Sequence, residues 1–128
     1  MESDDEILVM IHPRSRHLRA VRMLAADAGG RAGLDASEVD DLRIAVDELV
    51  QVLMGCTDDR ILIRISCFGP RVVVRGSTRD ENSQGDVARL GIVSELIVDA
   101  VSDHYALQHT EGRISFVVSK RAHRTVTA

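Results

Sequence analysis

Four arginines near the start of the chain are the side chains whose type and spacing most directly suggest a function. Arg14, Arg16, Arg19 and Arg22 follow one another at intervals of two or three residues. Clustered guanidinium groups attract and orient an acidic partner, so the run predicts a docking surface for an acidic protein. The run is also compatible with a solvated helix face beside an apolar stripe, and the sequence leaves both interpretations open.

Glu48 is the candidate for catalysis among the acidic residues. Its segment also contains Asp40, Asp41 and Asp47, so Glu48 is either a functional carboxylate or a solvated charge on a helix face. The histidines lack the spacing typical of metal ligands, and no metal site is predicted. These histidines are His12, His17, His104, His109 and His123.

Length and composition are those of a globular domain. The 128 residues are expected to form a single domain, 1–128, with an ordered core over about residues 6–120. A net charge of −4 and an aromatic content of 2% speak against nucleic acid as a partner, because they support neither phosphate neutralisation nor base stacking. The longest apolar run, Ile7–Ile11, is too short to cross a bilayer, so no membrane association is expected. Cys56 and Cys67 form no CxxC pair, which favours buried thiols in a cytoplasmic protein.

The first part of the chain predicts a strand and a helix. Branched apolar residues over Glu6–Ile11 indicate the strand. Ser15 is expected to cap a helix that runs to about Ala28 and ends at Gly29 and Gly30.

A second, longer helix is the most strongly marked element. Asp35 followed three residues later by Glu38 resembles a capping box, and Gly55 supplies the stop. The apolar positions between them have helical spacing. These positions are Val39, Leu42, Val46, Leu49 and Leu53.

The second half of the chain predicts four strands, one loop and one helix. The strands are expected at Arg60–Cys67, Arg71–Arg75, Asp103–Gln108 and Arg113–Lys120. Gly76–Gly85 is polar and without periodicity, which predicts a surface loop. A helix is expected to begin near Asp86 or Arg89, and a turn is expected over residues 109–112. The apolar positions of that helix are Leu90, Val93, Leu96 and Ile97.

This order of elements predicts the fold class. Sequential hairpins pair antiparallel, and three helices that each carry one apolar stripe can cover only one face of the resulting sheet. We therefore expect a two-layer α/β sandwich with a mostly antiparallel sheet, whose other face is open or used for oligomerisation.

The segment DDLRIAVDELVQVLMG, Asp40–Gly55, carries a resemblance to a known family. It is similar to the helix (L/I)xxAVxE(A/L)xxNAxxH of GHKL, or histidine-kinase-like, ATPase domains in short bacterial anti-sigma factors that double as switch-protein serine kinases. The segment Leu90–Val101 is similar to the family's GLGLxLIxxLxDxV. The order of elements matches from Ile7 to Lys120, which implies a Bergerat-type ATPase fold.

The sequence departs from the family where the nucleotide would bind. The resemblance implies that Glu48 is a general base and that an Asn one helical turn later holds Mg²⁺ against the ATP phosphates, but Val52 stands there. Gln51 is one residue off and could partly substitute. The DxGxG loop is replaced by RGSTR, which leaves Gly76, and the later glycine box is reduced to Gly85 and Gly91. The nucleotide-binding candidates are Glu48, Gln51, Gly76 and Gly91, in a site that has lost its metal ligand.

The functional hypothesis is a regulator that binds and sequesters an alternative sigma factor without a cofactor. The resemblance implies a homodimer, and an antagonist protein that competes for the regulator. The alternative is an active kinase that uses Mg-ATP to phosphorylate a serine on that antagonist. A small-ligand sensor that uses the vacated pocket is a third possibility.

Overall fold

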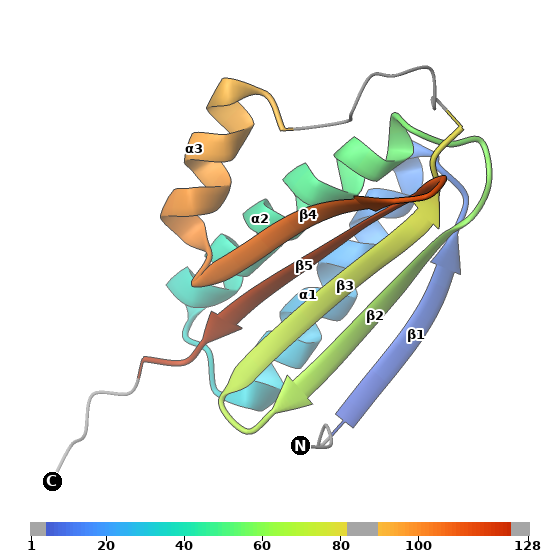
Figure 1. Ribbon diagram of the computed structural model, residues 1–128. Helices are drawn as coiled ribbons and strands as arrows, with labels where there is room; N and C mark the ends of the chain where they lie inside the picture. Colours follow the sequence, from blue (N-terminus) through green and yellow to red (C-terminus); the bar gives the residue numbers. More distant parts are fainter. Residues whose placement is uncertain (1–4, 82–89, 124–128) are drawn as a thin grey trace, which may run out of the picture.

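The computed structural model describes residues 5–81 and 90–123, which form five strands and three α-helices (Figure 1). In chain order the elements are β1 (Asp5–Ile11), a 3-10 turn η1 (Ser15–His17), α1 (Leu18–Ala32), α2 (Ala36–Met54), β2 (Ile61–Phe68), β3 (Arg71–Arg79), α3 (Ile92–Val101), β4 (His104–Thr110) and β5 (Arg113–Arg121). Within these residues no helix is both long enough and apolar enough to cross a membrane.

The strands form one antiparallel sheet in the order β1-β2-β3-β5-β4. Successive residues of a strand face opposite sides of the sheet. The register pairs Ile65 with Val74 and Val74 with Val118, so these three residues form one buried row across β2, β3 and β5. In the view of Figure 1, α1 and α2 lie behind the sheet, and α3 lies beside α2 and beyond the β4 edge. The predicted two-layer sandwich, with helices on one face of an antiparallel sheet, is confirmed.

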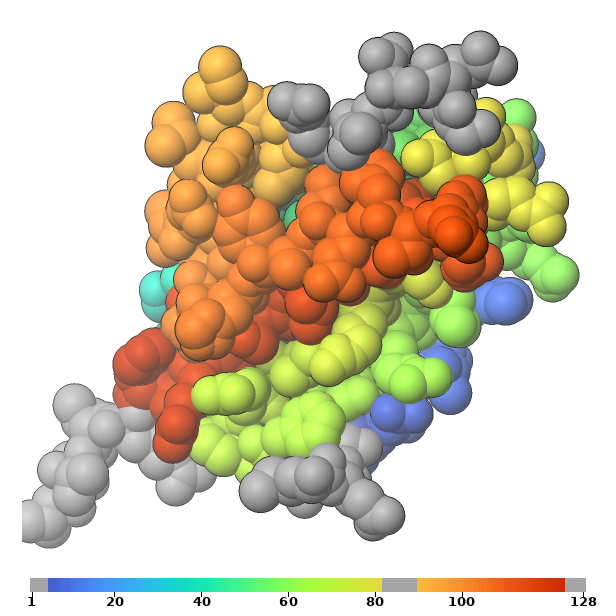
Figure 2. Space-filling view, viewed as in Figure 1, coloured from blue at the N-terminus to red at the C-terminus, as the bar shows by residue number. Residues whose placement is uncertain are grey.

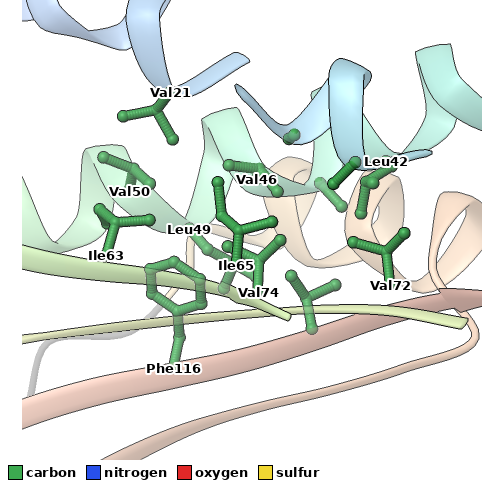
Figure 3. Packing of buried hydrophobic residues seen from close by; sticks show 14 of the residues in the cluster. Val21, Leu42, Val46, Leu49, Val50, Ile63, Ile65, Val72, Val74 and Phe116 are labelled. Atoms are coloured by element: carbon green, nitrogen blue, oxygen red, sulfur yellow. The ribbon is translucent and has the colours of Figure 1, made fainter. Parts of the chain in front are cut away.

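The core lies between α1 and α2 and the sheet (Figure 3). Val46 and Leu49 of α2 are fully buried and point toward Ile65, Val74 and Phe116 of the sheet. Branched aliphatic residues dominate this layer, and burial of each such side chain contributes about 1.5–3 kcal/mol to folding. The buried core thereby fixes the face that α2 turns to the sheet.

The capping box at the start of α2 is confirmed and has a further partner. Asp35 Oδ1 accepts from the Glu38 backbone N–H at 2.8 Å, and Glu38 Oε1 accepts from the Asp35 N–H at 2.9 Å. Glu38 Oε2 also accepts from the backbone N–H and the ring Nδ1 of His123, at 2.8 and 2.9 Å. The Asp35 N–H is the main cause that lowers the pKa of Glu38 to about 2, and the two His123 contacts lower it further against the opposing effect of burial.

The predicted end of α1 at Gly29 and Gly30 is wrong. The helix continues to Ala32 and ends at Gly33, which has φ 91°. An added Cβ at Gly29 would lie 3.0 Å from Leu34 Cδ1, so this glycine allows the chain after α1 to pack closely against the helix. The glycine is there for packing, whereas the stop requires the left-handed residue at Gly33.

The predicted loop from Gly76 is also wrong in its first part. β3 continues through Arg79, paired with β5 as far as Arg79↔Arg113. Thr78 is buried, and its hydroxyl donates to the Arg60 carbonyl at 3.0 Å, which anchors the strand end. Gly76, which has weak strand propensity, is held in β3 by its neighbours in the sheet. Residues 82–85 of the expected loop lie outside the described residues.

The last helix and hairpin differ from expectation at their ends. Helix α3 begins at Ile92, so Leu90 precedes it, while positions 86–89 lie outside the described residues. Its buried residue is Val98, whereas Val93 and Leu96 are 70% and 65% exposed. The following hairpin closes through Glu111 and Gly112, both with positive φ, which lets β4 pair up to Thr110.

Candidate functional site

The centre of the candidate site is the contact between α2 and α3. The Glu48 carboxylate of α2 is half-buried, and its Oε2 accepts a hydrogen bond from the Ser94 hydroxyl of α3 at 2.7 Å. The short distance is typical of a charge-assisted O–H···O⁻ bond. Glu48 therefore holds α3 against α2 and is not a purely solvated charge.

Val52 occupies the position one turn after Glu48, where the resemblance implies a magnesium ligand. Its side chain is half-buried and packs against the hydrophobic core. Its backbone carbonyl accepts from the Cys56 thiol at 3.2 Å. Magnesium in proteins is held by oxygen donors, and an isopropyl group offers none. The donor set at this turn of α2 therefore does not fit a Mg-ATP site.

Gln51 lies on the α1 side of this region. Its Nε2 donates to Asp47 Oδ2 at 3.1 Å, and Asp47 Oδ1 lies 3.6 Å from Arg22 Nε of α1. The Gln51 amide is thus part of an exposed polar group between α1 and α2. The structure does not bring it to the Glu48–Ser94 contact.

The two glycines predicted to contact nucleotide have different environments. Gly76 lies within β3, opposite Phe116 of β5, and an added Cβ would be 2.3 Å from Phe116 Cε2. The absence of a side chain at Gly76 thus makes room for an aromatic ring of the core. Gly91 is exposed at the N-cap of α3, where its carbonyl accepts from the Glu95 N–H at 2.9 Å, and an added Cβ would meet no atom. Gly76 therefore has a packing role, and Gly91 has none.

The arginine run forms part of the surface around η1 and the start of α1. Arg14, Arg16 and Arg19 are exposed, whereas Arg22 is half-buried and pairs with Asp47. Three of the four predicted partner-binding residues therefore present free guanidinium surface, and Arg22 also tethers α1 to α2.

A groove between α1 and α2, which the sequence did not predict, extends this surface. It has a volume of about 260 Å³ and is lined by Arg22, Asp40, Arg43, Ile44 and Asp47. Ile44 is 43% exposed, and Met23 of α1 is 62% exposed. The sequence did contain a signal for this groove. Ile44 falls between the core positions of α2, so it is an apolar residue outside the stripe that the helix buries.

Lys120 and Asp41 make a second tie that the sequence did not reveal. Lys120 of β5 is 8% exposed, and its Nζ donates to Asp41 Oδ2 at 3.3 Å and to the Val101 carbonyl at 3.1 Å. The ammonium group thus joins α2, the end of α3 and the sheet. A buried ammonium needs such partners because unpaired burial of a charge is costly.

The two cysteine thiols lie in the interior of the protein. Cys56 and Cys67 are both buried thiols that form no disulfide with each other, which confirms the predicted burial. Burial is the main cause that raises the pKa of the Cys56 thiol, with a contribution from the Asp80 carboxylate, so this thiol is a poor nucleophile. Over residues 5–81 and 90–123 no cluster of three or more His, Cys, Asp or Glu side chains could hold a metal ion.

Comparison with known proteins supports the fold assignment. No protein-family model matches the chain, and no curated protein matches it. Among solved structures, the chain matches the RsbU and RsbW domains of Rv1364c from Mycobacterium tuberculosis, with a TM-score of 0.70 at 18% sequence identity. The match covers 97% of this chain and 34% of that chain, so this chain spans about a third of its neighbour's length. At this identity the likeness establishes a shared fold.

Proposed function

We propose that this chain is an anti-sigma-factor-like regulator that binds and sequesters an alternative sigma factor, and that it has lost its ATP site. The observation that carries the proposal is the set of side chains at the α2–α3 contact, where a metal ligand would be needed. Glu48 accepts from Ser94, and Val52 packs against the core where the family places a metal-binding Asn. Phosphoryl transfer depends on metal-assisted charge neutralisation, so a site without that donor favours binding over catalysis.

The fold and the surface of the helix layer support this function. The two-layer sandwich resembles a structure that contains an RsbW domain, and the family resemblance of α2 implies anti-sigma activity. Arg14, Arg16 and Arg19 supply positive charge that would steer an acidic segment of the sigma factor, which mainly raises the association rate. Ile44 in the groove and the exposed Met23 of α1 supply apolar contact area, which contributes more to affinity.

Binding to sigma factors tests the proposal directly. The chain would be co-expressed with each candidate sigma factor and analysed by size-exclusion chromatography, followed by titration of the one that co-elutes. The double variant Arg16→Glu/Arg19→Glu is expected to lower affinity at least about tenfold. The double variant Arg79→Glu/Arg113→Glu, on the opposite face of the molecule, is the charge-matched control and should change affinity less than about twofold. Failure of every sigma factor to co-elute would contradict the proposal.

The second candidate is an ATP-dependent serine kinase that acts on an antagonist. The observation in its favour is that Glu48 is present and half-buried against α3. A thermal-shift titration with Mg-ATP separates the two functions, because a ligand at a hundredfold excess over its dissociation constant stabilises the folded state by about 2.7 kcal/mol. A magnesium-dependent rise in melting temperature would support the kinase, and its absence at millimolar nucleotide would support the binding regulator.

A further inference from the structure

The sheet face that carries no helix has an unusual charge pattern. It faces the viewer in Figures 1 and 2, where no described helix covers it. Six arginines occupy exposed positions of β2, β3 and β5 on this face. They are Arg64, Arg71, Arg75, Arg79, Arg113 and Arg121. We call this surface the arginine face. It is strongly basic although the whole chain has a net charge of −4.

These six arginines form three directly opposed cross-strand pairs. The register pairs Arg64 with Arg75, Arg71 with Arg121, and Arg79 with Arg113. Directly opposed residues have Cβ atoms about 4.5–5.5 Å apart, and like charges at such positions destabilise a sheet. A sequence under selection for stability alone would replace at least one member of each pair. The repeated pairing therefore points to a ligand that compensates the charge.

Neighbouring carboxylates compensate little of this charge. Glu6 of β1 lies 3.9 Å from Arg64 Nε and also accepts from the Ser66 hydroxyl at 3.1 Å. None of the other five arginines of the arginine face forms an ion pair with any residue in the described ranges 5–81 and 90–123. Glu6 is the single acidic side chain among the described strand positions on this side of the sheet.

A depression lies over the central pair of the arginine face. It has a volume of about 520 Å³, and its polar lining comes from Arg64, Arg75, Ser77, Ser115 and Gln108. All of these side chains can donate hydrogen bonds, and the guanidinium forks match carboxylate geometry. Nearby on β1, Leu8 and Met10 are 54% and 56% exposed. Donors and exposed apolar side chains thus occur together on this surface.

We infer that the arginine face docks an acidic, partly apolar, extended polypeptide segment of a partner protein. Arg71, Arg75 and Arg79 recur at every fourth residue of β3, which places them about 13 Å apart. An extended segment that runs along β3 with a carboxylate at every fourth residue would match that spacing. The arginine face belongs to the sheet layer and the arginine run to the helix layer, so this docking is independent of the proposed sigma-factor binding.

Two other occupants fit the surface less well. A second copy would meet it through a two-fold axis, which brings identical surfaces together and would oppose arginine pairs to arginine pairs. Nucleic acid would satisfy the charge, but Leu8, Met10 and Leu62, which lie near Arg64 on this face, are aliphatic and offer no platform for bases. Both occupants are outcomes that the test distinguishes.

The probe is a fluorescein-labelled peptide of three Glu-Leu-Ser-Gly repeats. Two other molecules are compared with it as competitors: the same peptide with Lys in place of Glu, and an oligothymidine. Fluorescence anisotropy should show salt-dependent binding of the Glu peptide alone. Arg75→Gln/Arg121→Gln should weaken it at least about tenfold, and Arg16→Gln/Arg19→Gln less than about twofold. Because the pairs repel each other, Arg75→Gln should keep or raise the melting temperature while it weakens binding.

Four results would overturn the inference. Equal weakening by the two double variants would show non-specific attraction, and preferential binding of oligothymidine would assign the face to nucleic acid. A lower melting temperature of Arg75→Gln would show that the arginine is structural. A change of oligomeric state in Arg75→Gln, measured by light scattering, would assign the face to a second copy. Sigma-factor binding is measured separately on Arg16→Glu/Arg19→Glu, so either proposal can fail alone.

Discussion

Gly76→Ala distinguishes a packing role from a nucleotide-binding role for the glycine in β3. The added Cβ would lie 2.3, 2.8 and 3.0 Å from Cε2, Cζ and Cδ2 of Phe116, a ring that is 3% exposed. Overpacking of this kind costs about 1–3 kcal/mol. The loss of a glycine from the unfolded ensemble returns about 0.4–1 kcal/mol. The net expectation is a loss of about 1–2 kcal/mol in the free energy of unfolding.

A double-mutant cycle with Phe116→Leu isolates this contact. Urea unfolding of the wild type, both single variants and the double variant gives four free energies of unfolding. Phe116→Leu alone should destabilise by creating space, and that space should accommodate the new methyl group in the double variant. The combined loss should therefore be smaller than the sum of the single losses by at least about 1 kcal/mol. Additive losses, or an unchanged stability of Gly76→Ala, would refute the packing account.

Three further variants test polar contacts of the fold. Glu38→Gln should lower stability at neutral pH by about 1–2 kcal/mol, because it removes the charge from the capping-box bonds, while solvent screens the ion pair with the exposed His123 ring. The folded pKa of about 2 lies below the reference of 4.5, so the wild type should lose this stabilisation as pH falls from about 4.5 to 2, and the variant should show a flatter profile in acid titration by circular dichroism. Asp41→Asn should cost about 1–3 kcal/mol in urea unfolding, because the Lys120 ammonium keeps one carbonyl partner, whereas Asp41→Asn with Lys120→Met should recover part of the loss. Ser94→Ala should cost about 1 kcal/mol by removing the bond to Glu48, and chemical-shift changes confined to α2 and α3 should confirm its local effect.

Local patterns in the sequence predicted most of the fold. The capping box at Asp35 and Glu38 and the apolar spacing of α2 fixed the longest helix, because both signals act over a few residues. The errors occurred where distant parts of the chain decide the outcome. Gly29 remains helical because Leu34 packs against it, and Gly76 remains in β3 because β5 pairs with it. Neither contact is visible in local spacing.

The candidate site was predictable in part. The α2 motif located Glu48 and Val52. No local pattern could reveal that the Ser94 hydroxyl donates a hydrogen bond to the Glu48 carboxylate. The arginines of the sheet were invisible as a group, because alternation along separate strands gathers them on one face only once the register is known. Surfaces assembled from several strands require the topology, whereas surfaces on one helix can be found from spacing alone.

The affinity for the co-eluting sigma factor, measured by calorimetry with and without Mg-ATP, tests the central claim most directly. A chain that has lost its nucleotide site should bind the sigma factor with the same dissociation constant, within about twofold, in both conditions. A dissociation constant that changes tenfold or more with Mg-ATP would show a coupled nucleotide site next to Glu48, and it would contradict the account.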